Sequence, residues 1–489
     1  MKDAILTQKF ENLRLFPKLR PELLSKAEGY IRKSATAELL RVNPLRFAKD
    51  QNVSEEESID LFVHATKVGL FDFAYNLLCP LCGGIVHTHH KLDEIQNKEF
   101  HCVACNVSIP TLLDDQVEVA FELHPSLREE EVNPFVNIDA YYRYYFSSNF
   151  NKSSQLLSWI QSTVRDFFPL EPETEKKVTV TLKADAEQGK VVQIVSIDRN
   201  AAVFFSVDPN ANPEPEIQVV DLLDSGFLPK TKSLPPGTYT FEIHNRSRWH
   251  AGIQVITPNP DRLNEIYTAF PTKVDPFLTA KVLLNNQSFR ELFRIHKLSP
   301  DLNLNVKSLT IMFTDLRGST EMYDKAGDLF AYKLVQEHFR ILTDTVREFK
   351  GAIVKTMGDA IMATFSSPLD GLMASAEMLQ KIDKMNDSWK QEGHEIGLKV
   401  GLNEGPALAV INDERLDYFG QSVNIAARVQ GLASSGEIWI SESVWNAPGS
   451  QDQIQEKGFT IEKHSARLKG VGVPTTVFKL SNATSVAPQ

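Results

Sequence analysis

The sequence has few cysteines, and it lacks both a long apolar run and a surplus of positive charge. No apolar run approaches the roughly 18–20 residues that a helix needs to cross a bilayer. The N-terminal stretch MKDAILTQKFENL lacks the continuous apolar core of a signal peptide. These absences predict a cytoplasmic protein without a transmembrane anchor.

The charge balance argues against a nucleic-acid binder. Lysine and arginine number 52 against 63 aspartates and glutamates, and the formal net charge is −11. Proteins that bind nucleic acid usually carry a basic surplus. The local excess of lysine and arginine in the first fifty residues is interpreted as a solvated helical face. The chain is 42% hydrophobic and 24% charged, which is typical of folded globular protein, and it has room for about three domains.

All of the cysteines fall in two CxxC motifs nineteen residues apart, Cys79-x-x-Cys82 and Cys102-x-x-Cys105. Two such knuckles can place four thiolates tetrahedrally around a zinc ion. The alternatives are a redox pair, which needs only one CxxC, and disulfides, which are disfavoured in the cytoplasm. Residues 76–115 are therefore predicted to form a zinc ribbon in which Zn²⁺ supplies much of the folding energy.

The segments on either side of this ribbon are predicted to be helical. Residues 1–75 are rich in helix formers, and Ser54 followed by Glu57 has the form of a capping box. A turn at Asn52–Ser54 makes a helix-turn-helix-like unit one interpretation of this region. Residues 116–175 are rich in aromatic residues and are also predicted to be helical.

The period of the pattern changes to two from Val178 on. Runs such as VTVTL and TYTFEI alternate apolar and polar residues and are separated by turn residues. Residues 176–258 are predicted to form a small antiparallel β-sandwich. Residues 259–306 return to a helical pattern, as a linker that is either a coupling element or a plain connector. Residues 481–489 are predicted to be a flexible tail.

Residues 307–480 alternate β and α patterns and are predicted to form an α+β domain of ferredoxin-like build. The strand-like run SLTIMFTD ends in Asp315, and IVKTMGDAIM carries Asp359 between two strand-like runs. If these strand ends are adjacent, the two carboxylates suit Mg²⁺ or Mn²⁺ and two-metal chemistry at phosphorus. The LRGST turn after Asp315 is predicted to present backbone N–H groups to a polyphosphate. A strand-end aspartate that only caps its strand is the alternative.

Two further pairs of residues suit a nucleotide. Asn424 and Arg428 are four residues apart and therefore share one helix face. An amide donor and a permanently charged guanidinium suit a phosphoryl group that gains charge in its transition state. A lysine beside an aspartate, as with Lys355 and Asp417, suits adenine, because N1 of adenine accepts and its N6 amine donates a hydrogen bond. Guanine would require the reverse polarity.

Five motifs, FTDLRGST, KTMGDAIMATF, GLNEGPALAVI, DYFGQSVNIAARV and RLKGVG, resemble in their order the class III adenylate/guanylate cyclase catalytic domain. The resemblance implies that Asp315 and Asp359, with the backbone at Leu316, hold two Mg²⁺ or Mn²⁺ ions. It also implies that Lys355 and Asp417 select adenine, since guanylate cyclases carry glutamate at the position of Lys355. It further implies that Asn424 orients the ribose, that Arg428 stabilises the transition state and that Lys469 binds the triphosphate.

In this family the site forms between two catalytic domains arranged head to tail, so the resemblance implies a homodimer with two equivalent sites. ATP would be converted there to cyclic AMP and pyrophosphate. The upstream region around LLCPLCGG is similar to the N-terminal region of a group of bacterial soluble cyclases, and it is predicted to regulate the enzyme. The alternatives are a catalytically degenerate cyclase-like nucleotide-binding module and a zinc-ribbon regulator that binds nucleic acid. The complete set of side chains disfavours the first, and the acidic balance disfavours the second.

Overall fold

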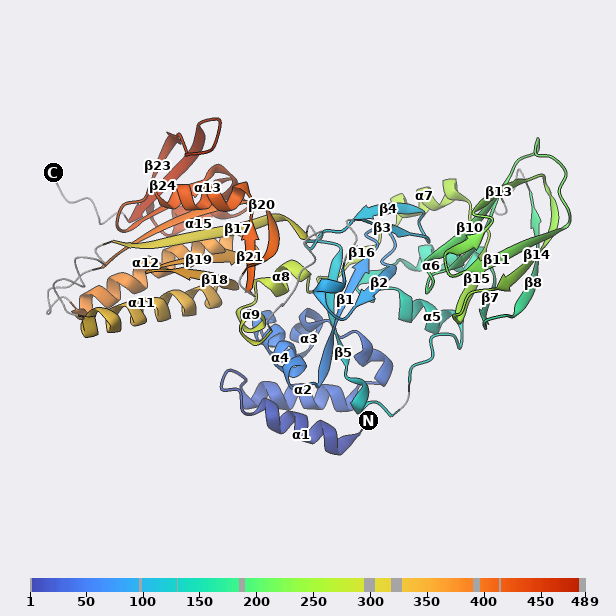
Figure 1. Cartoon of the computed structure of the whole chain (residues 1–489), viewed down its shortest axis with the longest axis horizontal. Helices are drawn as coiled ribbons and strands as arrows, with labels where there is room; N and C mark the ends of the chain where they lie inside the picture. The colour runs from blue at the N-terminus through green and yellow to red at the C-terminus, as the bar shows by residue number, and fades with distance from the viewer. Residues whose placement is uncertain are drawn as a thin grey trace.

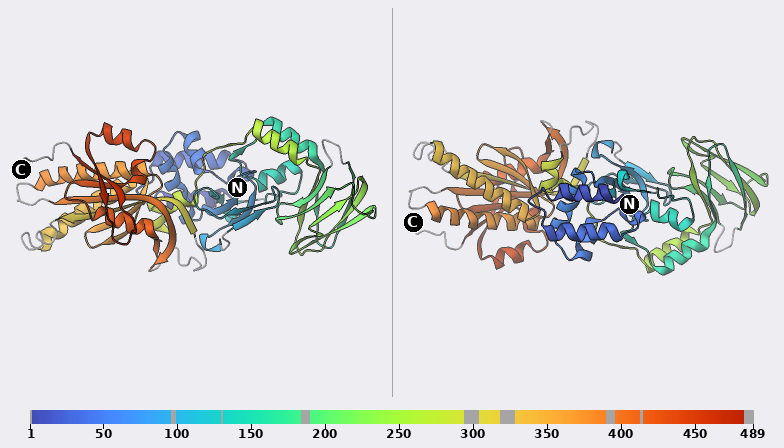
Figure 2. Two further views of the ribbon diagram at one scale, coloured as in Figure 1. Left: turned by 90° about the horizontal axis from the view of Figure 1, so that it is seen from above. Right: turned by 90° about the horizontal axis from the view of Figure 1, so that it is seen from below.

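The computed structural model describes residues 2–95, 99–129, 131–183, 190–293, 304–317, 328–389, 396–412 and 415–482. Three parts follow one another along its long axis: a C-terminal α/β domain, a central region of helices and short strands, and a β module (Figure 1). The views from above and below show the same order (Figure 2). No helix within these ranges has the length and apolar character needed to span a bilayer.

The N-terminal part is helical up to Lys67. Its helices are α1 (Asp3–Leu13), α2 (Pro21–Lys33), η1 (Thr36–Leu40), α3 (Pro44–Gln51) and α4 (Glu55–Lys67). The predicted capping box opens α4: the Ser54 hydroxyl accepts from the Glu57 N–H at 3.2 Å, and the Glu57 carboxylate accepts from the Ser54 N–H at 3.1 Å. Because α4 buries most of its central residues and carries glutamates in its first turn, it is poorly suited to contact DNA phosphates.

The cysteines of the central region lie at the ends of short strands and in the turns between them. Strand β1 (Phe71–Leu78) starts inside the segment predicted to be helical. It lies between β2 (Ile85–His89) and β5 (Val117–Leu123), and β3 (Glu99–Cys102) forms a hairpin with β4 (Val107–Pro110). Short 3₁₀ turns follow at η2 (Leu92–Glu94) and η3 (Pro125–Leu127).

The helical prediction for residues 116–175 is correct only in part. Helices α5 (Ile138–Tyr145) and α6 (Ser154–Thr163) are present, but β5, the short β6 (Phe150–Asn151) and β7 (Val164–Leu170) are strands. In β5 the run VEVAFEL alternates at a period of two, which is a strand pattern. Pairing with β1 satisfies its backbone groups.

Two sheets that enclose one apolar core make up the β module. Their strand orders are β13-β10-β9-β15-β7 and β12-β11-β14-β8. The β10–β13 and β11–β14 pairs are parallel, whereas the sequence predicts antiparallel pairing throughout. The bounds are β8 (Glu175–Leu182), β9 (Val191–Ser196), β10 (Ala201–Val207), β11 (Ile217–Leu223), β12 (Gly226–Leu228), β13 (Thr231–Leu234), β14 (Gly237–Asn245) and β15 (Ala251–Ile256).

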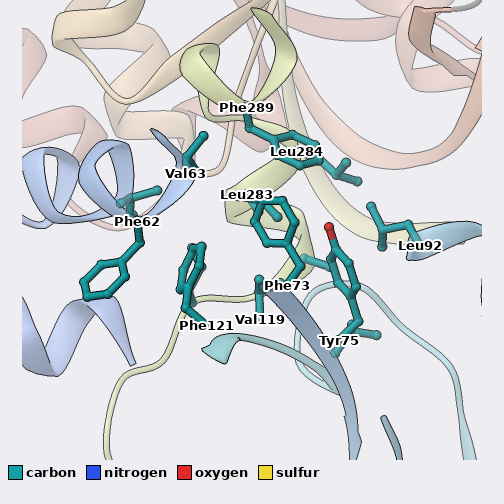
Figure 3. Close-up of a cluster of buried hydrophobic side chains, with 14 of the residues drawn as sticks. Phe62, Val63, Phe73, Tyr75, Leu92, Val119, Phe121, Leu283, Leu284 and Phe289 are labelled. Carbon is teal, nitrogen blue, oxygen red and sulfur yellow. The ribbon is translucent and has the colours of Figure 1, made fainter. Parts of the chain in front are cut away.

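The predicted linker is helical in pieces and packs into the central region. Its elements are α7 (Pro260–Ala269), β16 (Lys273–Val274), α8 (Ala280–Leu284) and α9 (Gln287–Leu292). Leu283, Leu284 and Phe289 are buried against Phe62, Phe73 and Phe121 (Figure 3). This burial is more extensive than a plain connector needs.

A mixed sheet with helices forms the C-terminal domain. The strand order is β18-β19-β17-β20-β22-β24-β23, and β21 pairs with β20. The strands are β17 (Leu304–Arg317), β18 (Gly351–Met357), β19 (Ala360–Phe365), β20 (Gly397–Asn412), β21 (Arg415–Phe419), β22 (Glu437–Ser441), β23 (Phe459–Ala466) and β24 (Thr475–Asn482). The tail predicted at 481–489 lies outside the described residues beyond Asn482.

Helices cover both faces of this sheet. The helices are α11 (Asp328–Glu348), α12 (Pro368–Trp389), α13 (Gln421–Gln430), α14 (Glu442–Trp445) and α15 (Ser450–Glu456). Residues Met312, Ala363 and Val400 face α11 and α12 in one core. Alternate residues of β17, such as Ile311, face a second core that includes Ala426 of α13 and extends into the central region. The sequence predicts the start of the first long helix near Ser319, which lies outside the described residues.

Candidate active site

Asp315 lies near the end of β17 and forms an ion pair. Its register partner on β20 is Lys399, and the Lys399 Nζ donates to Asp315 Oδ2 at 3.1 Å. Leu316 is paired with Leu398 in the same ladder, and its side chain is buried in the core beneath α11 and α12. Only its backbone can therefore serve a ligand, as the resemblance implies.

Asp359 lies in the tight turn of the hairpin formed by β18 and β19. Met357 pairs with Ala360, so Gly358 and Asp359 are the turn residues, and Gly358 adopts φ +65°, which favours glycine. Phe313 on β17 pairs with Met362 on β19. Continuing that antiparallel register places Asp315 level with Ala360, directly beside Asp359. The two acids thus lie at the same end of neighbouring strands, which is the condition on which the predicted metal site depends.

A buried histidine supports this turn. His338 on α11 directs Nε2 to the Asp359 carbonyl oxygen at 3.3 Å, and burial lowers the pKa of His338 to about 4. The ring is therefore neutral near pH 7 and donates one N–H to that carbonyl. The Thr314 hydroxyl accepts from the Ile361 N–H at 3.2 Å, which links β17 to the same turn.

Lys355 and Asp417 are brought together from two strands. The Lys355 Nζ donates to Asp417 Oδ2 at 2.7 Å, and the other carboxylate oxygen accepts from the Tyr418 N–H at 2.8 Å. The side chain of Asp417 is 11% exposed and that of Lys355 is 38% exposed. The carboxylate is thus held on both oxygens, while the lysine can still reach a ligand.

Asn424 and Arg428 share the exposed side of α13, as the four-residue spacing predicts. Helix α13 lies close to β20 because Gly401 has no side chain: a Cβ there would lie 2.2 Å from the Gln430 nitrogen. Lys469 is exposed in the loop between β23 and β24. Within the described part of the chain, no hydrogen bond or ion pair links Asn424, Arg428 or Lys469 to Asp315 or Asp359.

The candidate residues therefore come from different elements of one chain. The acids lie at one strand end, whereas Asn424 and Arg428 lie on an exposed helix face and Lys469 lies in a loop. The turn predicted to bind polyphosphate falls mostly on residues 318–327, outside the described residues. Carboxylate and backbone oxygens are ligands that Mg²⁺ and Mn²⁺ prefer, so the donor set of Asp315, Leu316 and Asp359 fits these ions.

Sequence reasoning missed Lys399 and His338. Lys399 is the charged residue of the run GLKVGLN, and its neighbours Leu398 and Val400 are buried. A lysine between two buried apolar residues of a strand is a signal that could have been used. His338 stands on a long amphipathic helix, where nothing local distinguishes it from a core residue.

The four cysteines form one cluster, with all sulfur atoms within 4.8 Å of one another. The Cys79–Cys105 and Cys82–Cys102 sulfur distances are 3.9 and 3.8 Å. A tetrahedral site with Zn–S bonds of about 2.3 Å places its sulfurs about 3.8 Å apart, whereas a disulfide bond is about 2.05 Å long. The cluster is consistent with a zinc site and has the wrong geometry for disulfides.

Family models match both the N-terminal and the C-terminal parts of the chain. Residues 304–479 match the family described as "Adenylate and Guanylate cyclase catalytic domain", so the C-terminal part is a class III nucleotidyl cyclase catalytic domain. Residues 7–291, more than half of the chain, match the "Family of unknown function (DUF5939)". The chain belongs to that family, and its cyclase domain follows the matched region.

Individual relatives match only part of the chain. An adenylate cyclase of Anabaena cylindrica is 31% identical over 156 residues, which is 29% of this chain and 30% of that protein. Adenylate cyclase 2 of Rhizobium meliloti (strain 1021) is 30% identical over 132 residues, 25% of this chain and 36% of that protein. The chain thus spans about a third of these relatives.

Among solved structures, the adenylyl cyclase CyaB from P. aeruginosa is similar at 22% identity with a TM-score of 0.32. The likeness covers 37% of this chain and 97% of that one. The description of the matched family names both adenylate and guanylate cyclases. The choice between ATP and GTP as substrate therefore has to be inferred from the site.

Proposed function

We propose that the chain is an adenylate cyclase that converts ATP to 3′,5′-cyclic AMP and pyrophosphate. The observation that carries the choice of nucleotide is the Lys355–Asp417 pair at 2.7 Å. A lysine donor beside an aspartate acceptor matches N1 and the N6 amine of adenine. With guanine, the lysine donor would face a donor and the aspartate acceptor would face an acceptor. Unpaired buried polar groups cost about 1–3 kcal/mol each.

The remaining residues have the chemistry that the reaction needs. The 3′-oxygen of the ribose forms a bond to the α-phosphorus and its proton passes to solvent. The bond between the α-phosphorus and the oxygen that bridges it to the β-phosphorus breaks, and pyrophosphate leaves with that oxygen. We assign to Arg428 the stabilisation of the negative charge that develops, to Asn424 the orientation of the ribose, and to Lys469 the binding of the triphosphate. Asp315, Asp359 and the Leu316 backbone would hold Mg²⁺ or Mn²⁺, which would supply positive charge to the phosphates.

We assign the complete site to two copies of the chain. Within the described residues, the acids make no hydrogen bond or ion pair to Asn424, Arg428 or Lys469. This supports the assignment, because each chain can then contribute one group to each of two sites. A homodimer with the catalytic domains head to tail satisfies this requirement. We also assign a regulatory role to the N-terminal region, which shares an apolar core with the cyclase domain.

The test is product formation by the full chain with ATP or GTP and either Mg²⁺ or Mn²⁺. Cyclic AMP is expected to form from ATP at least about 100-fold more efficiently than cyclic GMP from GTP. Equal use of the two nucleotides would contradict the proposed specificity. Binding of ATP without any product would favour a degenerate nucleotide-binding module instead.

A second prediction concerns the cysteine cluster, to which we assign a structural Zn²⁺. The full chain is expected to contain about one zinc ion per copy, and Cys79→Ser to lose it, as measured by elemental analysis. Loss of the metal should cost about 4 kcal/mol and lower the thermal midpoint by about 10 °C. His87→Ala is the matched control, because His87 is exposed nearby but outside the cluster. Unchanged zinc content in Cys79→Ser would contradict the assignment.

A further inference from the structure

Helix α9 lies between the central region and the strands that carry Lys355 and Asp417. On the central side, the rings of Phe289 and Phe293 pack against Phe73 of β1, with centroid distances of 5.5 and 5.1 Å. Figure 3 shows Phe289 above Phe73, with Val63 of α4 nearby. One face of α9 thus belongs to the apolar core of the N-terminal region.

Two polar contacts hold the same helix to α4. The Asn286 side-chain amide donates to Asp60 Oδ1 at 2.9 Å, and the Lys67 Nζ donates to the Leu292 carbonyl oxygen at 3.0 Å. These contacts lie at the two ends of α9. The position of α9 is therefore set by α4 and β1.

On the other side, α9 contacts the backbone of the cyclase domain. The Gln287 side-chain oxygen accepts from the Ile353 N–H on β18 at 2.9 Å. Arg290 donates to the Leu416 carbonyl oxygen on β21 at 2.5 Å, and its guanidinium lies 6.0 Å from the centre of the Tyr418 ring. Arg290 also donates to the Leu284 carbonyl of α8 at 3.2 Å, which fixes its direction.

Both contacts are made at strand edges. Among the described residues, β18 is the edge strand at one end of the sheet, and β21 pairs with β20 alone. The outward N–H and C=O groups of such edges need partners from elsewhere in the protein, and Gln287 and Arg290 supply them.

These edges are next to the base-selecting pair. Leu416 directly precedes Asp417, and Ile353 is two residues before Lys355. The pairing of β18 with β19 shifts register between Ile353 and Lys355, and such irregularities redirect the side chains that follow. The two strands are not paired with each other, so the Lys355–Asp417 distance depends on what holds them in place.

We propose that Gln287 and Arg290 are positioning residues for nucleotide selection: by holding β18 and β21 to one helix, they set the geometry of Lys355 and Asp417. This inference rests on the proposed adenylate cyclase activity. It also makes the selectivity of the site depend on α4 and β1, through the position of α9. Side chains far from the substrate would then control which nucleotide is used.

The experiment measures kcat and KM of the full chain for ATP and GTP, and the affinity for each nucleotide in the same samples. Gln287→Leu and Arg290→Met remove the two backbone contacts with little change in volume. Each is expected to lower the ratio of ATP to GTP efficiency by about 3- to 30-fold, with a raised KM for ATP. Arg290→Lys keeps one donor and should fall between the wild type and Arg290→Met.

Lys18→Ala is the matched control. The Lys18 Nζ pairs with Glu291 of α9 at 3.0 Å but contacts neither β18 nor β21, so the nucleotide ratio should stay at the wild-type value. A purely structural role for Gln287 and Arg290 would lower the thermal midpoint, or kcat for both nucleotides equally, and leave the ratio unchanged. That result would overturn the inference.

The affinity measurements separate this inference from the proposed function. A wild type that prefers ATP in binding but forms no cyclic AMP would contradict only the proposed activity. In that case, loss of the binding preference in Gln287→Leu and Arg290→Met would still support the positioning role. An unchanged preference in both variants would overturn it.

Discussion

Asp315→Ala and Arg428→Ala are each expected to reduce cyclic AMP formation at least about 100-fold, and an equimolar mixture of the two is expected to regain activity. In a shared site, one chain supplies Asp315 and the other supplies Arg428. With random exchange, half of the dimers are mixed and each has one intact site, so activity should return to about a quarter of the wild-type value. The measurement is the rate of cyclic AMP formation after subunit exchange.

The structure provides a control for this experiment. Asp315 and Asp359 lie at the same strand end, so they belong to the same half of the site. A mixture of Asp315→Ala with Asp359→Ala should therefore remain inactive, since no mixed dimer has an intact site. Recovery in this control, or no recovery in the first mixture despite verified exchange, would contradict the shared-site arrangement.

Lys355→Glu is expected to lower the efficiency of ATP turnover at least about 100-fold without weakening the dimer. The substitution replaces the donor that faces adenine with an acceptor. It also brings a second carboxylate close to Asp417, which now lies 2.7 Å from the lysine Nζ, and like charges at that distance repel. The measurements are kcat/KM for ATP and the dimer fraction by analytical ultracentrifugation.

Lys333→Glu makes the same change of charge at an exposed position of α11 and should behave as the wild type. Unchanged ATP turnover in Lys355→Glu would show that the Lys355–Asp417 pair does not select the base. A parallel loss of the dimer would indicate a structural role for the lysine.

Local sequence patterns predicted those features that depend on neighbouring residues. The Ser54–Glu57 capping box, the cysteine knuckles and the shared helix face of Asn424 and Arg428 each need only a short stretch of chain. The proximity of Lys355 and Asp417, which are far apart in sequence, followed from the chemistry of adenine and from the resemblance. That proximity is present, while their role stays a prediction.

The predictions that failed, and the residues that were missed, depend on what packs against each segment in the fold. The run VEVAFEL in β5 alternates like a strand, but the aromatic-rich stretch after it favoured a helical prediction for the whole region. Gln287 and Arg290 look like ordinary helix-surface residues in the sequence. Their partners are backbone groups of β18 and β21, and only the tertiary structure shows that those edges need them.

The apolar core described above joins α4, β1, β5, α8 and α9 to one face of the cyclase sheet. A cyclase fragment that begins at Leu304 would lack α8 and α9, which share this core, and would leave Tyr418 without Arg290 above its ring. Exposed apolar patches of this kind promote aggregation or non-specific association. The catalytic domain therefore cannot be transferred to another protein by itself. A transfer that keeps its surface covered has to include α8, α9 and the core residues that pack against them.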